Sequence, residues 1–129
     1  MTITSFEELE IWQEARELAK VIRTLTRKEP FLRDYKLCNQ INGSAGSVMD
    51  NIAEGFERDG HKEFIQFLYI AKGSNGETRS QIYRAFDAEF ILENELNDVL
   101  SRTKSIRIKT IGLINYLKKS NFKGNKFKT

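Results

Sequence analysis

The chain has 129 residues, of which 40% are hydrophobic and 30% charged, so it can bury one core and is too apolar for wholesale disorder. Its longest apolar run, Phe67–Ala71, is far shorter than the roughly 20 residues that a membrane-spanning helix needs. A single cysteine excludes an internal disulfide, and the acidic N-terminus does not resemble a secretion signal. These features predict a cytoplasmic protein with no membrane segment.

The net charge of +3 is distributed unevenly along the chain. Residues 1–98 hold 12 bases and 18 acids, a net charge of −6, and no acidic residue follows Asp98. The nine bases after that point are Arg102, Lys104, Arg107, Lys109, Lys118, Lys119, Lys123, Lys126 and Lys128. An acidic body with a basic end indicates a polyanion site or contacts between copies. A lysine-rich tail that only increases solubility is the alternative.

The first helix is predicted over residues 6–28. Ser5 and Glu8 have the spacing of a capping box, which marks a helix start. The helix ends near Pro30, since proline lacks the N–H that a helix interior requires. Its apolar stripe is Ile11, Ala15, Leu18, Ile22 and Leu25. Trp12 flanks this stripe and is expected in the core.

The second helix is predicted over residues 33–58, with the stripe Ile41, Ala45, Val48, Ile52 and Phe56. Cys38 lies on this stripe, so we expect a small buried side chain rather than a nucleophile. After a turn at Asp59-Gly60, the third helix is predicted over residues 61–87. Its stripe is Phe64, Leu68, Ala71, Asn75, Thr78, Ile82 and Ala85.

The fourth helix is predicted over residues 94–119, with the stripe Leu96, Val99, Thr103, Ile106, Thr110, Leu113 and Leu117. Residues 121–129 are expected to form a basic flexible tail. Four helices of similar length, joined by short connections, predict an all-α fold over residues 1–120. The expected topology is an up-down-up-down antiparallel four-helix bundle.

The residues that a metal or catalytic site would require are scarce. A di-iron site in a bundle needs paired Glu-x-x-His motifs, and a zinc site needs several soft ligands. The chain has one histidine, His61, and one cysteine, Cys38. We interpret His61 as a solvated residue at the start of the third helix. No metal, cofactor or enzymatic activity is predicted.

Two Gly-Ser-x-Gly segments begin at Gly43 and Gly73, and neither matches a Walker loop or a nucleophile elbow. If the second and third helices form a hairpin, Gly43 lies level with Gly76. Gly46 then lies level with Gly73. Glycine inside a helix costs about 0.5–1 kcal/mol relative to alanine, so this matching favours close approach of another backbone over mere tolerance. The predicted oligomer interface comprises Gly43, Gly46, Ile65, Tyr69, Gly73 and Gly76.

Three segments resemble the four-helix proteins encoded in intervening sequences of bacterial 23S ribosomal RNA genes. They run from Phe6 to Ala15, from Gln40 to Gly55 and from Lys62 to Glu77. The resemblance implies a homopentameric ring. It also implies kinship with the accessory variability determinant of diversity-generating retroelements, which binds nucleic acid and a reverse transcriptase.

The sequence departs from its relatives in the second helix. Asn42-Gly43 stands where relatives commonly carry a basic pair, and Met49 stands where many have proline. Losing two positive charges weakens the case for phosphate contacts at this point and shifts it to the C-terminal part of the chain.

Two functions are open on this evidence. The first is a homo-oligomer that binds RNA or DNA weakly through its basic C-terminal third. The residues expected to contact phosphate are Arg102, Arg107, Lys109, Lys118, Lys119, Lys123, Lys126 and Lys128. The second is a protein–protein adaptor or scaffold without nucleic-acid binding, whose partner is a reverse transcriptase or another protein.

Overall fold

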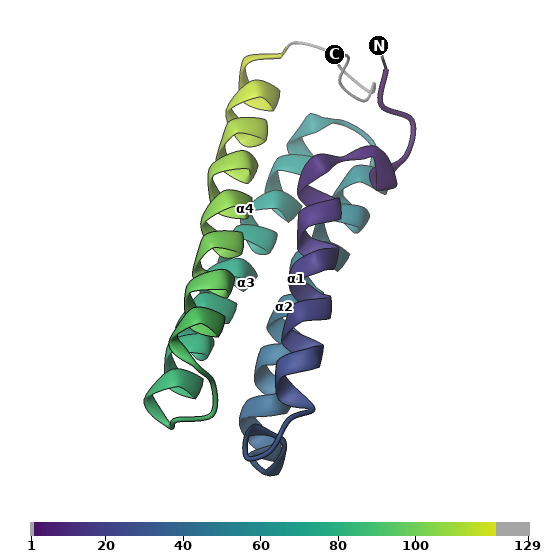
Figure 1. The fold of residues 1–129 in the computed structure, drawn as a ribbon. Helices are drawn as coiled ribbons and strands as arrows, with labels where there is room; N and C mark the ends of the chain where they lie inside the picture. The colour runs from purple at the N-terminus through teal and green to yellow at the C-terminus, as the bar shows by residue number, and fades with distance from the viewer. Residues whose placement is uncertain (1, 121–129) are drawn as a thin grey trace.

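The computed structural model describes residues 2–120 and consists of four long helices packed as a bundle (Figure 1). The helices are α1 (Glu10–Thr26), α2 (Tyr35–Glu57), α3 (His61–Asp87) and α4 (Glu93–Lys119). Short 3₁₀ turns at Phe6–Glu8 and Phe31–Arg33 precede α1 and α2. The described part of the chain contains no β-strand element, which confirms the all-α prediction. The predicted tail, 121–129, lies outside the described residues.

The N-terminal end of the first helix differs from the prediction. A 3₁₀ turn over Phe6–Glu8 is separated from α1 by Leu9, whose extended backbone (ψ 126°) interrupts the helix. The predicted capping contact is present within this turn, because the Glu8 carboxylate accepts hydrogen bonds from the N–H groups of Thr4 (2.9 Å) and Ser5 (3.0 Å). These two N–H groups lower the pKa of Glu8, Thr4 most strongly.

The core lies where the apolar stripes predict it. The stripe residues of α1, α2 and α3 are buried, with the exception of Cys38. In α4, Leu113 is only partly buried, and Ile114 takes the predicted core position. The predicted stripe of α4 repeats every 3.5 residues, whereas a straight helix drifts by about 20° per heptad against that repeat. Leu113 lies two heptads after Val99, so it has rotated out of the core.

Three residues placed by the sequence analysis lie differently in the structure. Trp12 and Cys38, expected in the core, are partly buried and pack at its edge. His61, interpreted as solvated, is half-buried, and its two ring nitrogens are enclosed without a hydrogen-bond partner within residues 2–120. It follows Gly60 directly, whose positive φ of 85° turns the chain sharply between α2 and α3.

Side-chain hydrogen bonds between α2 and α3 fix how these two helices lie against each other. The Ser44 hydroxyl donates to Gln81 Oε1 at 2.6 Å and lies 2.7 Å from the Thr78 hydroxyl. One turn further along α2, the Ser47 hydroxyl lies 2.9 Å from that of Ser74, one turn earlier in α3. The two helices therefore run in opposite directions. Buried hydroxyl and amide groups satisfy one another along this contact.

The other neighbouring helices are tied by similar contacts. Asn75 of α3 donates to the Thr103 carbonyl of α4 at 2.8 Å, and Arg79 donates to the Leu100 carbonyl at 2.8 Å. Each helix packs against the next in sequence, and α1 also packs against α4, which closes the bundle (Figure 1).

The glycine that permits close packing within the chain is Gly55. A Cβ atom there would lie 2.6 Å from Phe67 Cβ and 3.1 Å from Phe64 Cδ1, both on α3. A methyl group at this point would therefore collide with the neighbouring helix, so glycine allows α2 and α3 to approach closely. Sequence reasoning did not single this residue out for packing, although its position beside the core stripe of α2 could have suggested it.

Candidate nucleic-acid and subunit interfaces

Two of the predicted phosphate-binding bases are engaged by the protein's own carboxylates. Lys109 of α4 forms ion pairs with Glu10 (2.8 Å) and with Glu14 of α1, and the Ser105 hydroxyl donates to Glu14 at 2.7 Å. The hydrogen bonds that Lys109 donates to Glu10 and, secondly, to Glu14 raise its pKa. Arg102 pairs with a carboxylate of its own helix.

The partner of Arg102 is Asp98, which lies one turn earlier in α4; Arg102 Nε is 3.0 Å from the Asp98 carboxylate. The carboxylates around Arg102 and Lys109 offset both positive charges, and they lie on the side of α4 that faces α1. A phosphate arriving here would have to displace carboxylates that are already bound, so these two bases are poorly placed to bind one.

The remaining described bases of α4 lie on other sides of the helix. Lys104, Arg107 and Lys119 are exposed and form no ion pair or hydrogen bond within the described part of the chain. Arg107 lies two turns after Leu100, whose carbonyl binds Arg79 of α3, so Arg107 is on the α3 side of α4. Three further predicted contacts, Lys123, Lys126 and Lys128, fall outside the described residues.

Lys118 lies on the same side of α4 as Arg107. Its ammonium donates to the Tyr69 hydroxyl at 2.7 Å and lies 5.3 Å from the centre of the ring. The phenol is a neutral partner, so Lys118 keeps its positive charge while its position is fixed. Arg107, Lys118 and Tyr69 together form a face that carries positive charge and an aromatic ring, and we call these three residues the α3–α4 face.

Three of the predicted interface residues lie on this face or next to it. Tyr69 is 46% exposed and contacts α4 through Lys118. Ile65 lies one turn before Tyr69, and Gly76 lies two turns after it, so helical spacing puts both on the same side of α3. A subunit contact through Tyr69 would therefore cover part of the α3–α4 face.

The other three predicted glycines lie on sides of the bundle other than the α3–α4 face. Gly43 is one turn before Ser47, which contacts α3, and Gly73 precedes Ser74, which contacts α2. Gly46 is one turn before Met49, which lines a groove between α1 and α2. At all four glycines of the two Gly-Ser-x-Gly segments a Cβ atom would have no neighbour within 4 Å, so they have no packing role within the described part of the chain.

A basic groove between α1 and α2 was missed by the sequence analysis. It has a volume of about 500 Å³, and its lining includes Arg16, Lys20, Arg23 and Arg27 of α1 and Met49 of α2. The four bases follow one another at steps of four, three and four residues, which is the spacing of one helix face. That spacing is visible in the sequence and could have revealed the stripe.

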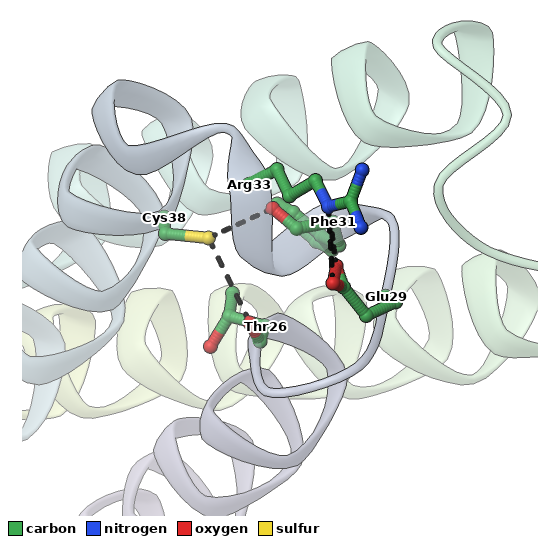
Figure 2. Close-up of polar contacts among 5 residues, drawn as sticks. All are labelled: Thr26, Glu29, Phe31, Arg33 and Cys38. Atoms are coloured by element: carbon green, nitrogen blue, oxygen red, sulfur yellow. Dashed lines mark hydrogen bonds and ion pairs between the residues drawn. The ribbon is translucent and has the colours of Figure 1, made fainter.

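The one cysteine lies beside the turn that joins α1 to α2 (Figure 2). The Cys38 thiol donates to the Phe31 carbonyl at 3.2 Å and lies 3.8 Å from the Thr26 carbonyl. Burial, and secondly the charge of Asp34, raise the pKa of the thiol. Both effects disfavour the thiolate, which is the reactive form. Figure 2 also shows Arg33, whose Nε contacts both carboxylate oxygens of Glu29 at 3.0 Å.

Two further features of residues 2–120 bear on possible sites. No group of three or more histidine, cysteine, aspartate or glutamate side chains is arranged to hold a metal ion within these residues. Over the same part of the chain, no helix combines the length and the apolar character needed to cross a bilayer.

Comparison with known proteins adds a family and a similar fold. Residues 7–112 match the family model described as 23S rRNA-intervening sequence protein. A crystal structure at 1.70 Å of a protein of unknown function from the S23 ribosomal protein family of Bacteroides thetaiotaomicron VPI-5482 has a TM-score of 0.74 to this chain. The two are 20% identical over 81% of this chain and 97% of that one, a level at which the likeness concerns the fold alone. No curated protein matches the chain.

Proposed function

This chain belongs to the 23S rRNA-intervening sequence protein family, and we propose that it is a non-enzymatic, homo-oligomeric four-helix bundle that binds RNA or DNA weakly. The proposed topology is up-down-up-down, supported by the opposite directions of α2 and α3. The proposed oligomer is a ring, of five subunits by resemblance to the family. A bacterial cytoplasm is the proposed location, which suits a chain whose one cysteine is a free thiol.

The observation that carries nucleic-acid binding is the α3–α4 face. Arg107 is exposed and has no carboxylate partner in the described residues, and Lys118 is held over a neutral ring. Bases without acidic partners can neutralise phosphates and release condensed counterions. Tyr69 adds an exposed aromatic surface on which a base can stack. Bases and an aromatic ring on one face suit a single strand better than a duplex.

The proposal divides the eight predicted phosphate contacts into two groups. Arg107, Lys118 and Lys119 are assigned to phosphate, together with Lys123, Lys126 and Lys128. Arg102 and Lys109 are assigned to the contact between α1 and α4, because their carboxylate partners already offset their charge. Among residues 2–120, no arrangement of side chains is suited to reading base edges, so the binding is proposed to be indifferent to sequence.

The test compares two substitutions that remove the same charge from the same helix. Labelled single-stranded RNA and DNA are titrated at about 50 and 200 mM salt with the wild type, Arg107→Gln and Arg102→Gln. Arg107→Gln is expected to reduce the slope of log K against log salt by roughly 0.7 per subunit that contacts the strand. Arg102→Gln, the matched control, is expected to leave the slope nearly unchanged. If the wild type does not bind at 50 mM salt, nucleic-acid binding is refuted.

A protein–protein adaptor is the second candidate, and exposed apolar side chains favour it. Tyr35 is 73% exposed, Leu92 65% and Ile108 54%. Such side chains are candidates for burial by a partner, although single exposed apolar residues are also ordinary. A reverse transcriptase or another protein would be the partner. Loss of nucleic-acid binding in the titration, with the oligomer intact, would leave this function as the leading one.

A further inference from the structure

The charged residues of α1 are sorted between two sides of the helix. Glu10 and Glu14 face α4, where Lys109 binds both. Bases occupy the opposite side in one stripe: Arg16, Lys20, Arg23 and Arg27, all of them exposed. The stripe extends about 16 Å at 1.5 Å per residue. One helix thus presents acid to its own bundle and base to the outside.

These four bases, with Ala19 of α1 and Met49 of α2, define the basic groove, of about 500 Å³. Lys20 is paired with Glu17 at 3.4 Å, and Arg16 lies 5.8 Å from the centre of the Trp12 ring. Arg23 and Arg27 have no ion-pair partner within residues 2–120. Excess positive charge therefore faces outward along the groove, which creates a surface complementary to acid.

The α2 wall of the groove is small and uncharged. Asn42 donates to the Thr26 hydroxyl of α1 at 3.0 Å, and Gly46 and Met49 follow it at helical spacing. Gly46 has no side chain, and a Cβ atom there would meet nothing within 4 Å. Another backbone can therefore approach this wall closely between the basic side chains and α2.

A surface of similar length that carries mainly acidic side chains lies on the adjacent side of the bundle, and Arg84, which donates to Gln40 of α2 at 3.2 Å, lies at one end of it. Glu54 of α2 lies two turns after Ser47, and Glu77 of α3 lies one turn after Ser74, so both are beside the contact of α2 with α3. Asp50 lies one turn before Glu54, so it is on the same side of α2. The acidic seam is defined as Asp50, Glu54 and Glu77 together with Gly43, Ile70 and Gly73, and its three acids are exposed.

The acidic seam also offers an apolar contact and close access to backbone. Ile70 is 51% exposed and lies one turn before Gly73. Neither Gly43 nor Gly73 has a neighbour within 4 Å of the position of a Cβ atom. Glu54 forms an ion pair with Arg58 at 2.9 Å, whereas Asp50 and Glu77 have no ion pair within residues 2–120. Acid, an apolar side chain and bare helix backbone thus meet on one surface.

The two surfaces lie at matching levels along the bundle. Thr26 is level with Asn42, to which it is hydrogen-bonded, so Arg23, three residues earlier, is level with the residues just after Ser44. Ser44 is in turn bonded to Thr78, the neighbour of Glu77. Arg23 and Glu77 are therefore at about the same level on adjacent sides.

The same spacing applies at the other end of the stripe. Arg16 lies seven residues before Arg23 and is consequently level with the stretch between Asp50 and Glu54. Arg16 and Arg23 thus each have a carboxylate at their own level, so a neighbouring copy needs no shift along the helix axis to pair these two arginines with the acidic seam.

We propose that the basic groove of one copy receives the acidic seam of the next copy in a head-to-tail interface. The proposal rests on the homo-oligomer proposed above and names the two surfaces that form it. Because the surfaces lie on adjacent rather than opposite sides, successive copies turn and do not form a straight row. Because the two surfaces lie at one level, successive copies are not shifted along the axis of rotation. Rotation without rise closes a ring, whereas a rise would give a filament.

The interface also accounts for three of the four glycines in the Gly-Ser-x-Gly segments. Gly43 and Gly73 lie on the acidic seam and Gly46 lies on the wall of the basic groove, so the helix backbones of two copies meet where side chains are absent. Ile70 and Met49 supply apolar area, while the charges fix orientation and select the partner surface. Helix-interior glycines that are unfavourable in the isolated chain become useful in the assembly.

The test reverses charge on each surface and then combines the changes. One variant is Arg16→Glu with Arg23→Glu, and another is Asp50→Lys with Glu77→Lys. Light scattering at about 50 mM salt is expected to give several subunits for the wild type and a mass near 15 kDa for each variant. An equimolar mixture of the two variants is expected to give a mass above that of either variant alone, because each reversed surface then meets a complementary one. The alternating order that this pairing requires fits species with an even number of subunits and does not close a ring of five. The fourfold variant is expected to assemble alone.

The control is Lys104→Glu with Lys119→Glu, which reverses two exposed charges outside both surfaces and is expected to leave the mass unchanged. Circular dichroism confirms that each variant is folded. A monomeric wild type would refute the homo-oligomer itself. An oligomeric wild type with fully assembled reversal variants would overturn only this interface, as would failure of the mixture to recover mass. If the basic-groove variant keeps its mass but loses binding to single-stranded RNA, the groove takes nucleic acid and the proposal is wrong.

Discussion

Replacing Gly55 with alanine adds one methyl group where α2 and α3 approach closely. The new Cβ would lie 2.6 Å from Phe67 Cβ and 3.1 Å from Phe64 Cδ1. Phe67 Cβ is fixed to the backbone of α3, so it cannot rotate away as the end of a long side chain could. The two helices must separate locally, or the methyl group must be accommodated by a shift of α2.

Two opposing terms set the size of the effect. Alanine is favoured over glycine in a helix interior by about 1 kcal/mol. Overpacking of a well-packed contact costs about 1–3 kcal/mol. We therefore expect Gly55→Ala to lower the free energy of unfolding by about 0–2 kcal/mol. Gly112→Ala is the matched control, because Gly112 is also inside a helix but has nothing within 4 Å of its Cβ position. It is expected to raise the free energy of unfolding by about 1 kcal/mol.

The difference between the two variants isolates the steric term, since the helix propensity gain is common to both. Urea unfolding followed by circular dichroism, at one protein concentration, is expected to place Gly55→Ala about 1–3 kcal/mol below Gly112→Ala. The m-value is expected to be the same for both. If Gly55→Ala is as stable as Gly112→Ala, the close approach of α2 and α3 at this glycine is not present in solution.

Three further predictions concern titration and reactivity. The pKa of Lys109 is raised by its bonds to Glu10 and Glu14, so its stabilising contribution is complete below the ordinary value of 10.5 and is lost as pH rises through the raised pKa. The stability difference between the wild type and Lys109→Gln should shrink in that range, and a difference that persists would contradict the ion pairs. The pKa of Glu8 is lowered, so its contribution is complete above 4.5 and is lost as pH falls through the lowered pKa. Wild type and Glu8→Gln should converge in stability on acidification. Cys38 should react slowly with a thiol reagent until denaturant is added, and rapid native labelling would refute its burial.

The sequence by itself determined the helices and most of the core. The stripe from Phe64 to Ala85 is buried at every predicted position, including the polar Asn75 and Thr78. Such patterns are readable because helix pitch is a local property and apolar side chains recur with it. The start of α1 was missed because the extended backbone of Leu9 interrupts a pattern that is otherwise continuous. Leu113 was misplaced because a small drift per heptad accumulates along a long helix.

Only the tertiary structure decided which charges and glycines have partners. Lys109 looked like any other base of the C-terminal third, yet it is bound to Glu10, 99 residues away in sequence. The repeated Gly-Ser-x-Gly segments led to a prediction of close helix packing at their glycines. Among the described glycines, the one that lies against another helix of the same chain is Gly55. A side chain's neighbours across a bundle depend on the rotation and level of separate helices, which no local pattern records. The contact partners of the charged residues and glycines are therefore known only once the helices are packed against one another.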